Sequence, residues 1–311
     1  MSFTELPVPV FLAWWAVVGL LVGSFLNVAI HRHGIEGESV SKPRRSRCPS
    51  CKTTLTWREN IPLLSWLVLR GRCRTCGWRI PVRYPLVEAL NAAAWVWIAA
   101  QSFPERWALG LVECIVISGL IVATFVDFDC FEIPDEVSIG GLVAAPIVSF
   151  LLPELHQGGW VANWITGPGQ LEPTRLAALA SALAGMAVGA GILFGIGWIG
   201  SRIYGRDAMG LGDVKLLGAG GGFVGPGAVL VALMIGALSA SVFGLFNILR
   251  FAWLVRRRNQ RRGRAKGLGH ALWIGRAAGR YLPFGPFLAL GIGAVLLFWR
   301  DIVVYLPFGH G

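Results

Sequence analysis

Long apolar runs separated by polar connections determine what this chain can fold into. A helix needs about 20 residues to cross the ~30 Å hydrocarbon core of a bilayer, and several runs reach that length. The chain is 55% hydrophobic and 14% charged, with a mean hydropathy of +0.61, whereas a soluble domain carries about 25% charged residues. The sequence therefore predicts an all-α polytopic membrane protein with about eight spans. The expected spans are residues 9–30, 86–104, 107–127, 137–152, 174–204, 214–224, 228–250 and 283–299.

Two polar segments carry most of the net charge of +11. Residues 31–84 hold twelve Lys/Arg against three Glu, and residues 254–282 hold nine Lys/Arg and no acid. The positive-inside rule places both segments in the cytoplasm. The chain must then cross an even number of times between them, so residues 214–224 must also cross, which gives eight spans with both termini outside. This charge concerns topology and contact with membrane lipid. No nucleic-acid-binding fold accompanies it, so no nucleic-acid partner is expected.

Four of the six cysteines form two C-x-x-C pairs within the first basic segment. The pairs are Cys48/Cys51 and Cys73/Cys76, and 21 residues separate them, slightly more than the commonest zinc-ribbon spacing. The chain is too long and too poor in cysteine for a secreted disulfide scaffold. The pattern favours Zn²⁺ held by four thiolates, with reduced free thiols as the alternative. Four thiolates leave no open coordination position, so we expect a structural metal in a small cytoplasmic loop domain.

A lone carboxylate stands among glycines in Gly210-Leu211-Gly212-Asp213. Ionisable residues at membrane depth are costly and are functional by default. Gly210 and Gly212 remove side chains beside Asp213, which lets another backbone come close. The third apolar run ends in Asp127, and the crossing count puts Asp127 and Asp213 on the same, cytoplasmic side. Two carboxylates a few ångströms apart share a proton, so this pairing indicates aspartyl hydrolase chemistry.

The segment that follows Asp127 is strongly acidic. We expect Ile133-Pro134 to end the third helix, because the residue before a proline disfavours the helical conformation. We expect Asp135 to be the N-cap of the fourth helix. The remaining acids of the segment are Asp129, Glu132 and Glu136.

Several motifs occur in a fixed order along nearly the whole chain. They are Gly23-Ser24-Phe25-Leu26-Asn27-Val28, the two C-x-x-C pairs, Glu59-Asn60-Ile61-Pro62 with Ser65-Trp66, Arg83-Tyr84-Pro85-Leu86-Val87-Glu88, Asp127 seven residues before Pro134, Gly210-Leu211-Gly212-Asp213, and Pro283-Phe284-Gly285-Pro286. This set resembles the type IV prepilin peptidases, or leader peptidases, which share Gly-x-Gly-Asp with presenilin-type intramembrane proteases. The expected division is a first helix (1–30), a zinc-binding domain (31–84) and a peptidase core (85–311).

The resemblance implies an aspartyl endopeptidase of the bacterial inner membrane. Its substrates would be type IV prepilins and type II secretion pseudopilins, cut after a glycine at the cytoplasmic face. Asp127 and Asp213 take the catalytic positions, and Asp129 remains the alternative to Asp127. Many members then methylate the new N-terminus with S-adenosylmethionine, and the zinc-bearing loop is associated with that form. No Gly-x-Gly-x-x-Gly fingerprint follows a strand here, so this activity and this cofactor rest on the resemblance alone.

The resemblance leaves some features open. Leaders are basic, so we expect Asp129, Glu132, Asp135 and Glu136 to attract them; the alternative is that these acids cap helices and meet solvent. The connection between the catalytic acids and the loop 254–282 are both longer than usual in the family. A proton-coupled transporter would place its carboxylates near the midplane instead of one face. A non-enzymatic assembly factor docking through its zinc loop would not need Asp127 and Asp213. The sequence carries no signal of oligomeric state.

Overall fold

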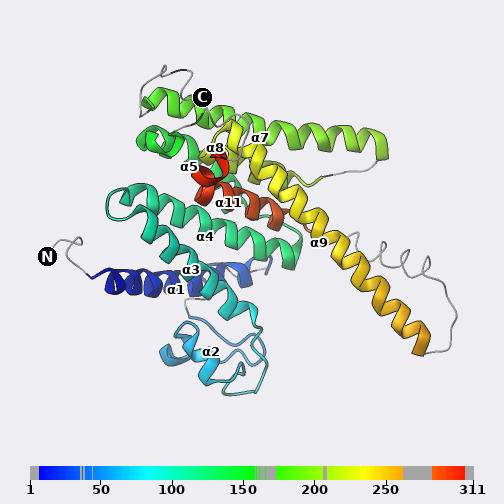
Figure 1. The fold of residues 1–311 in the computed structure, drawn as a ribbon. Helices are drawn as coiled ribbons and strands as arrows, with labels where there is room; N and C mark the ends of the chain where they lie inside the picture. The colour runs from blue at the N-terminus through cyan, green and yellow to red at the C-terminus, as the bar shows by residue number, and fades with distance from the viewer. Residues whose placement is uncertain are drawn as a thin grey trace.

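The computed structural model describes residues 7–35, 37, 39–43, 45–157, 159, 161, 165, 173–205, 209–261 and 282–304. A helix occupies each of the eight predicted spans (Figure 1). These helices are α1 (Val8–Arg32), α3 (Arg83–Ser102), α4 (Trp107–Cys130), α5 (Asp135–Leu151), α7 (Arg175–Tyr204), α8 (Leu211–Val224), α9 (Pro226–Arg261) and α11 (Gly285–Val304). The part of the chain that the structure describes also holds the short helices η2 (Trp57–Asn60), α2 (Leu64–Val68) and η3 (Pro153–His156). Within the described ranges the only β-type pairing is three isolated bridges.

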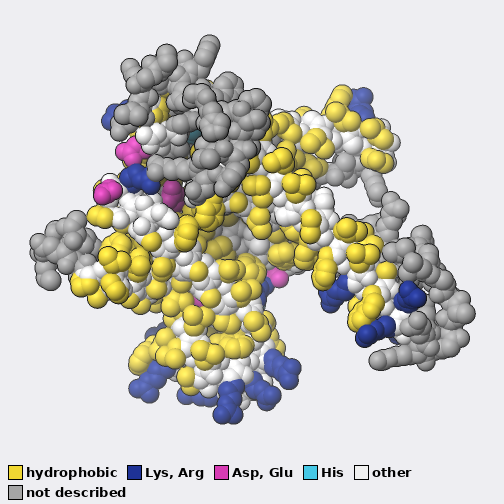
Figure 2. Space-filling model, viewed as in Figure 1, with side chains coloured by type: hydrophobic (Ala, Val, Ile, Leu, Met, Phe, Trp, Pro, Cys, Tyr) yellow, Lys and Arg dark blue, Asp and Glu magenta, His cyan; other side chains and the backbone are white. Residues whose placement is uncertain are grey.

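Among the described residues, four helices (α1, α4, α7 and α9) are long and apolar enough to cross a membrane by length and composition. Apolar side chains cover the helical body, and several large ones face outward, such as Leu21 at 57% and Val242 at 70% exposure. Lys and Arg gather instead over the loop domain at the bottom of the view and at the free end of α9 (Figure 2). An outer surface that is apolar over the helices and basic beyond them is that of a multi-pass membrane protein.

Small residues allow helices α1 and α3 to touch along their backbones. A Cβ added at Gly19 would lie 2.8 Å from the Cα of Ala92, and one added at Gly23 would lie 2.8 Å from the Cα of Glu88. The buried amide of Asn91 donates to the carbonyl of Gly19 at 2.8 Å. Close contact of this kind replaces the hydrophobic effect, which does not drive helix association in lipid.

Glycines also allow α8 to pack closely against its neighbours in the centre of the molecule. A Cβ at Gly189 on α7 would lie 2.5 Å from the carbonyl oxygen of Leu217, and Gly185 and Gly221 lie closer still to each other. All residues of α8 from Leu216 to Phe223 are buried. Helix α8 is therefore fixed between its neighbours, and its N-terminal residues have a defined position.

His156 on η3 forms hydrogen bonds with both α5 and α7. It is 2% exposed, with Nε2 2.9 Å from the hydroxyl of Ser149 on α5 and Nδ1 3.1 Å from the hydroxyl of Ser181 on α7. Burial lowers the pKa of His156 to about 4, because an ion is costly away from water. The neutral ring is thus a polar connection between η3, α5 and α7.

The turn from α4 to α5 differs in detail from the sequence prediction. Helix α4 ends at Cys130, before Ile133-Pro134, because Phe131 adopts the left-handed conformation with φ of 57°. Pro134 is the N-cap of α5 and Asp135 is its first residue, so the predicted N-cap role of Asp135 is wrong. Asp135 still lies in the first helical turn, where a negative charge interacts favourably with the helix dipole.

Candidate active site

The structure brings Asp127 and Asp213 together from distant parts of the sequence. Asp127 is 5% exposed in the last turn of α4, and Asp213 is half-buried in the first turn of α8. The two carboxylates are close enough for their charges to interact. Ile133 lies next to Gly212, the residue before Asp213, and next to Gly285, whose added Cβ would also meet Asp127. The predicted pairing of acids is therefore compatible with the fold.

A third helix, α11, contacts Asp127 through its N-terminus. The backbone N–H of Gly285 donates to Oδ2 of Asp127 at 3.0 Å. A Cβ at Gly285 would lie 2.6 Å from the same oxygen, so the contact requires glycine. The motif Pro283-Phe284-Gly285-Pro286 thus supplies a hydrogen bond at the site, a contact that the sequence did not predict.

Helix dipoles favour negative charge at this place. Asp127 lies at the C-terminal end of α4, which is unfavourable for an acid, but the N-terminus of α11 faces it. Asp213 lies in the first turn of α8. Unpaired N–H groups at helix N-termini attract anions. Two such ends converging on two carboxylates form a site that can stabilise one negative charge and hold one proton.

Two ion pairs flank the carboxylates. Arg83 at the start of α3 pairs with Asp129, two residues after Asp127. Lys215, two residues after Asp213, pairs with Asp135 at the start of α5. Each pair ties the helix end that bears one candidate catalytic acid to a neighbouring helix. Neither Arg83 nor Lys215 was predicted to have such a role, because the sequence does not show which ends meet.

The other acids of this segment are more accessible. The side chain of Glu132 is 72% exposed, and its carboxylate lies 3.9 Å from Nε2 of His33. Glu136 is also exposed. Asp129 and Asp135 each already have a cationic partner. Of the four acids predicted to attract a basic leader, only Glu132 and Glu136 thus present a charge without a Lys or Arg partner among the described residues.

The two C-x-x-C pairs form matching turns in the loop domain. Arg47 and Thr54 form a bridge around the first turn, and Arg72 and Arg79 form one around the second. The residue after each second cysteine has a positive φ, 57° at Lys52 and 71° at Gly77. In both turns the N–H of that residue donates to the carbonyl of the first cysteine at 2.9 Å. The two pairs therefore present their sulfurs in similar ways.

The sulfurs of Cys48, Cys51, Cys73 and Cys76 converge. All four ligand atoms lie within 4.8 Å of one another, with Sγ–Sγ distances of 3.8 Å between Cys48 and Cys76 and 4.0 Å between Cys51 and Cys73. Tetrahedral thiolates at about 2.3 Å from Zn²⁺ would be about 3.8 Å apart. The cluster could hold a metal ion of this kind.

Local donors favour thiolates in part of the cluster. Hydrogen bonds from the side chain and backbone of Thr53 lower the pKa of Cys51 to about 6. Backbone N–H groups of Cys76 and Thr75 lower the pKa of Cys73. Burial raises the pKa of Cys48 to about 11. Metal binding releases protons from such thiols, so affinity would increase with pH.

A helical membrane bundle with two carboxylates meeting at one end has the architecture of an aspartyl membrane peptidase. Comparison with known proteins agrees: the chain belongs to the type IV leader peptidase family, whose model matches residues 114–245. The model of the bacterial peptidase A24 N-terminal domain matches residues 17–102, which include the cysteine cluster. No solved structure matches the chain.

Three relatives illustrate the similarity. The prepilin leader peptidase/N-methyltransferase of Myxococcus xanthus is 36% identical over 242 residues, which are 78% of this chain and 64% of that protein. The protein of the same name from Aeromonas hydrophila is 32% identical over 307 residues, covering 91% of this chain and 89% of its own length. The type 4 prepilin-like proteins leader peptide-processing enzyme of Escherichia coli O78:H11 is 35% identical over 293 residues, covering 88% and 89%.

Proposed function

We propose that this chain is a prepilin leader peptidase of the bacterial inner membrane. It removes the basic leader of type IV prepilins and type II secretion pseudopilins after a glycine, and then methylates the new N-terminus. The observation that carries the proposal is the meeting of Asp127 and Asp213 at two helix N-termini. The names of the Myxococcus xanthus and Aeromonas hydrophila relatives include both activities. Neither a transporter nor a non-enzymatic assembly factor gains support from the comparisons.

The mechanism uses the two acids in different protonation states. One carboxylate is ionised and takes a proton from water. The water oxygen then bonds to the carbonyl carbon of the glycine that ends the leader. The other carboxyl is protonated and gives its proton to the carbonyl oxygen. The C–N bond then breaks: the leaving amine receives a proton from the first acid, and the proton on the former carbonyl oxygen returns to the second acid, which leaves a carboxylic acid at the end of the leader. The N-termini of α8 and α11 favour the negative charge that the pair retains.

Gly210 and Gly212 support this chemistry by leaving space beside Asp213. A Cβ at Gly210 would lie 3.6 Å from Oδ2 of Asp213, and one at Gly212 would lie 3.3 Å from Cβ of Ile133. Without these side chains, an extended substrate backbone can approach the acid. Asp127 is preferred to Asp129 as the second acid because the N–H of Gly285 binds Asp127, whereas Asp129 pairs with Arg83.

The proposed topology has eight crossings, both termini outside and both basic segments in the cytoplasm. Helix α9 would be about 54 Å long at 1.5 Å per residue, so its last turns, which include Arg256–Arg258, would extend past a core of about 30 Å. Helix α8, at about 21 Å, is shorter than that core. Because its second half is buried among other helices, it need not match the lipid, and Asp213 would lie recessed from the membrane surface.

The cysteine cluster in residues 31–84 would hold Zn²⁺ as a structural metal, for which four converging thiols are a suitable donor set. The methyl donor would be S-adenosylmethionine, which would supply an electrophilic methyl group to the new N-terminal amine. The accessible acids Glu132 and Glu136 would attract the basic leader. Asp129 and Asp135 would contribute less, since Arg83 and Lys215 offset their charges.

The proposal is tested by co-expressing the chain with a type IV prepilin and following leader loss on gels. Asp127→Asn should abolish cleavage, whereas Asp129→Asn, two residues along the same helix, should cleave within about fivefold of the wild type, the effect of losing one partly exposed ion pair. Equal membrane levels of all variants are the control. Full cleavage by Asp127→Asn would refute the assignment of the acid pair.

A further inference from the structure

One apolar side chain, that of Ile133, lies between two glycines that border the acid pair. A Cβ added at Gly212, the residue before Asp213, would lie 3.3 Å from Cβ of Ile133. A Cβ added at Gly285 would lie 3.0 Å from Cδ1 of Ile133 and 2.6 Å from Oδ2 of Asp127. The side chain of Ile133 therefore extends from the start of α8 to the start of α11, and its Cδ1 methyl group and Oδ2 of Asp127 border the same small space.

The backbone around Ile133 holds this side chain in a defined place. Ile133 precedes Pro134, and a proline restricts the backbone of the residue before it. Pro134 is buried and is the N-cap of α5. Its carbonyl accepts hydrogen bonds from the N–H of Ser138 at 3.0 Å and from the hydroxyl of Ser138 at 3.1 Å. Ile133 also packs against the hydrophobic core of the bundle, so it can act as a rigid wall.

The accessible side of the acid pair is the side on which Ile133 lies. Gly210 is exposed, and Gly212, Asp213 and Ile133 are half-buried, whereas Asp127 is buried. A substrate can therefore enter between the start of α8 and the turn from α4 to α5. The carbonyl carbon of the residue before the scissile bond has to come within reach of both carboxylates, so this residue would pass beside Ile133.

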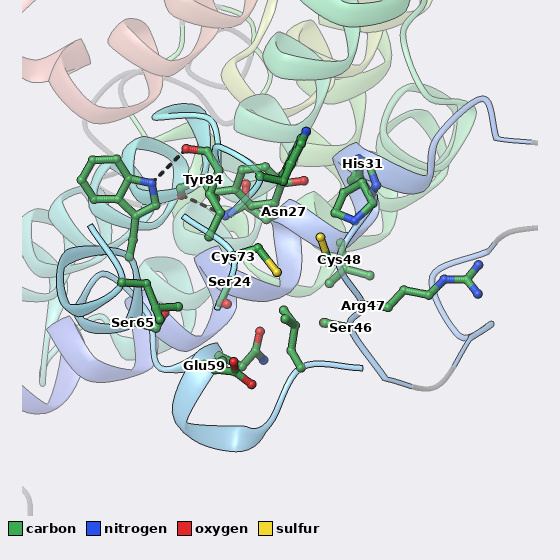
Figure 3. A pocket seen from close by; sticks show the side chains of 18 of the residues that line it. Ser24, Asn27, His31, Ser46, Arg47, Cys48, Glu59, Ser65, Cys73 and Tyr84 are labelled. Atoms are coloured by element: carbon green, nitrogen blue, oxygen red, sulfur yellow. Dashed lines mark hydrogen bonds between the residues drawn. The ribbon is translucent and has the colours of Figure 1, made fainter. Parts of the chain in front are cut away.

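We infer that Ile133 determines the size of the residue that can precede the scissile bond and restricts this position to glycine. The inference rests on the cleavage after glycine proposed above and adds the residue that selects for it. The cavity of about 340 Å³ between the loop domain and helices α1 and α3 (Figure 3) is lined by neither acid, and the same holds for a cavity of about 280 Å³ beside η3. A side chain before the scissile bond would thus have to share the space beside the acids with Ile133.

A competition experiment on the purified full chain in detergent tests the inference. Two prepilins that differ only in having Gly or Ala before the scissile bond are mixed in equal amounts, and mass spectrometry follows the early loss of each leader. The wild type should prefer glycine by about 10- to 200-fold in kcat/KM, the usual effect of one extra methyl or methylene group in a tight site. Ile133→Ala removes more volume than the methyl group of the alanine substrate adds, so this preference should fall at least about tenfold.

The matched control is Ile139→Ala on α5. Ile139 is 44% exposed and is not among the nearest neighbours of the glycines beside the acids, so its preference should equal that of the wild type. Because both prepilins compete for the same enzyme molecules, the ratio does not depend on how much of a variant is folded. If Ile133→Ala cleaves neither prepilin, Ile133→Val decides, and its preference should fall by about threefold or more.

The outcomes separate the inference from the proposed function. An unchanged preference in Ile133→Ala, or in Ile133→Val where the first variant is inactive, would overturn the inference and leave the proposed function standing. An equal fall in Ile139→Ala would also overturn it, because general loosening of the bundle would then explain the change. A wild type that cleaves both prepilins at equal rates would overturn it as well. A wild type that cleaves neither prepilin would overturn both the inference and the proposed function.

Discussion

Gly285→Ala should slow prepilin cleavage by roughly ten- to 150-fold, although it adds only one methyl group outside the acid pair. The new Cβ would lie 2.6 Å from Oδ2 of Asp127 and 3.0 Å from Cδ1 of Ile133. Ordinary contact begins near 3.4 Å, so the carboxylate or the start of α11 must move by about 0.8 Å. The 3.0 Å hydrogen bond from the N–H of Gly285 would then lengthen or break.

The expected loss follows from that hydrogen bond. A hydrogen bond to a charged group contributes about 1.5–3 kcal/mol, which corresponds to roughly a ten- to 150-fold loss in kcat/KM. Displacement of a catalytic group by about 1 Å is expected to cost about a hundredfold. The assay is the rate of prepilin cleavage in membranes that contain equal amounts of each variant.

The control for this variant is Gly293→Ala, on the same helix. A Cβ there would meet only the ends of two flexible side chains, Ile117 at 3.3 Å and Leu120 at 3.8 Å. Its cleavage rate should stay within about threefold of the wild type, because such ends can shift at little cost. Equal rates for Gly285→Ala and Gly293→Ala would refute the argument that α11 positions Asp127.

Three further predictions concern other parts of the molecule. The folded pKa of His156 is below its ordinary value of 6.5, so the unfolded chain binds more protons and stability should decrease by about 3 kcal/mol as pH drops from 6.5 to 4; melting in detergent should show this decrease, and His156→Gln should lose most of it. Cys51→Ser should reduce bound zinc, measured by mass spectrometry, from about one ion per chain to a small fraction, because it removes one of four ligands; undiminished zinc would contradict the site. Glu132→Lys with Glu136→Lys should raise KM for prepilin a few-fold at low salt and less at high salt; an unchanged KM would mean that these acids only face solvent.

The sequence predicted the helices because hydropathy is a property of each run by itself. All eight expected spans are helical, and only the ends differ, as in α4, where the left-handed Phe131 stops the helix before Pro134. The convergence of the four cysteines also follows from local spacing. Chain crossing itself depends on the lipid and stays a prediction.

The contacts between distant segments could not be read from the sequence. The pairing of Asp127 with Asp213 was predicted from the crossing count, but the N–H of Gly285 comes from 158 residues away. The ion pairs of Arg83 and Lys215 likewise depend on which helix ends become neighbours. Asp129 and Asp135 were grouped with Glu132 and Glu136 because they are close in sequence, whereas the fold gives the first two a cationic partner.

The intact mass of a type IV prepilin co-expressed with this chain tests the central claim most directly. With the wild type, the prepilin should lose its leader up to and including the glycine and gain about 14 Da, the mass that one N-methylation adds. With Asp213→Asn, present in the membrane at the same level, it should keep its full length. A prepilin that loses its leader equally with Asp213→Asn would contradict the claim that Asp127 and Asp213 together cleave it.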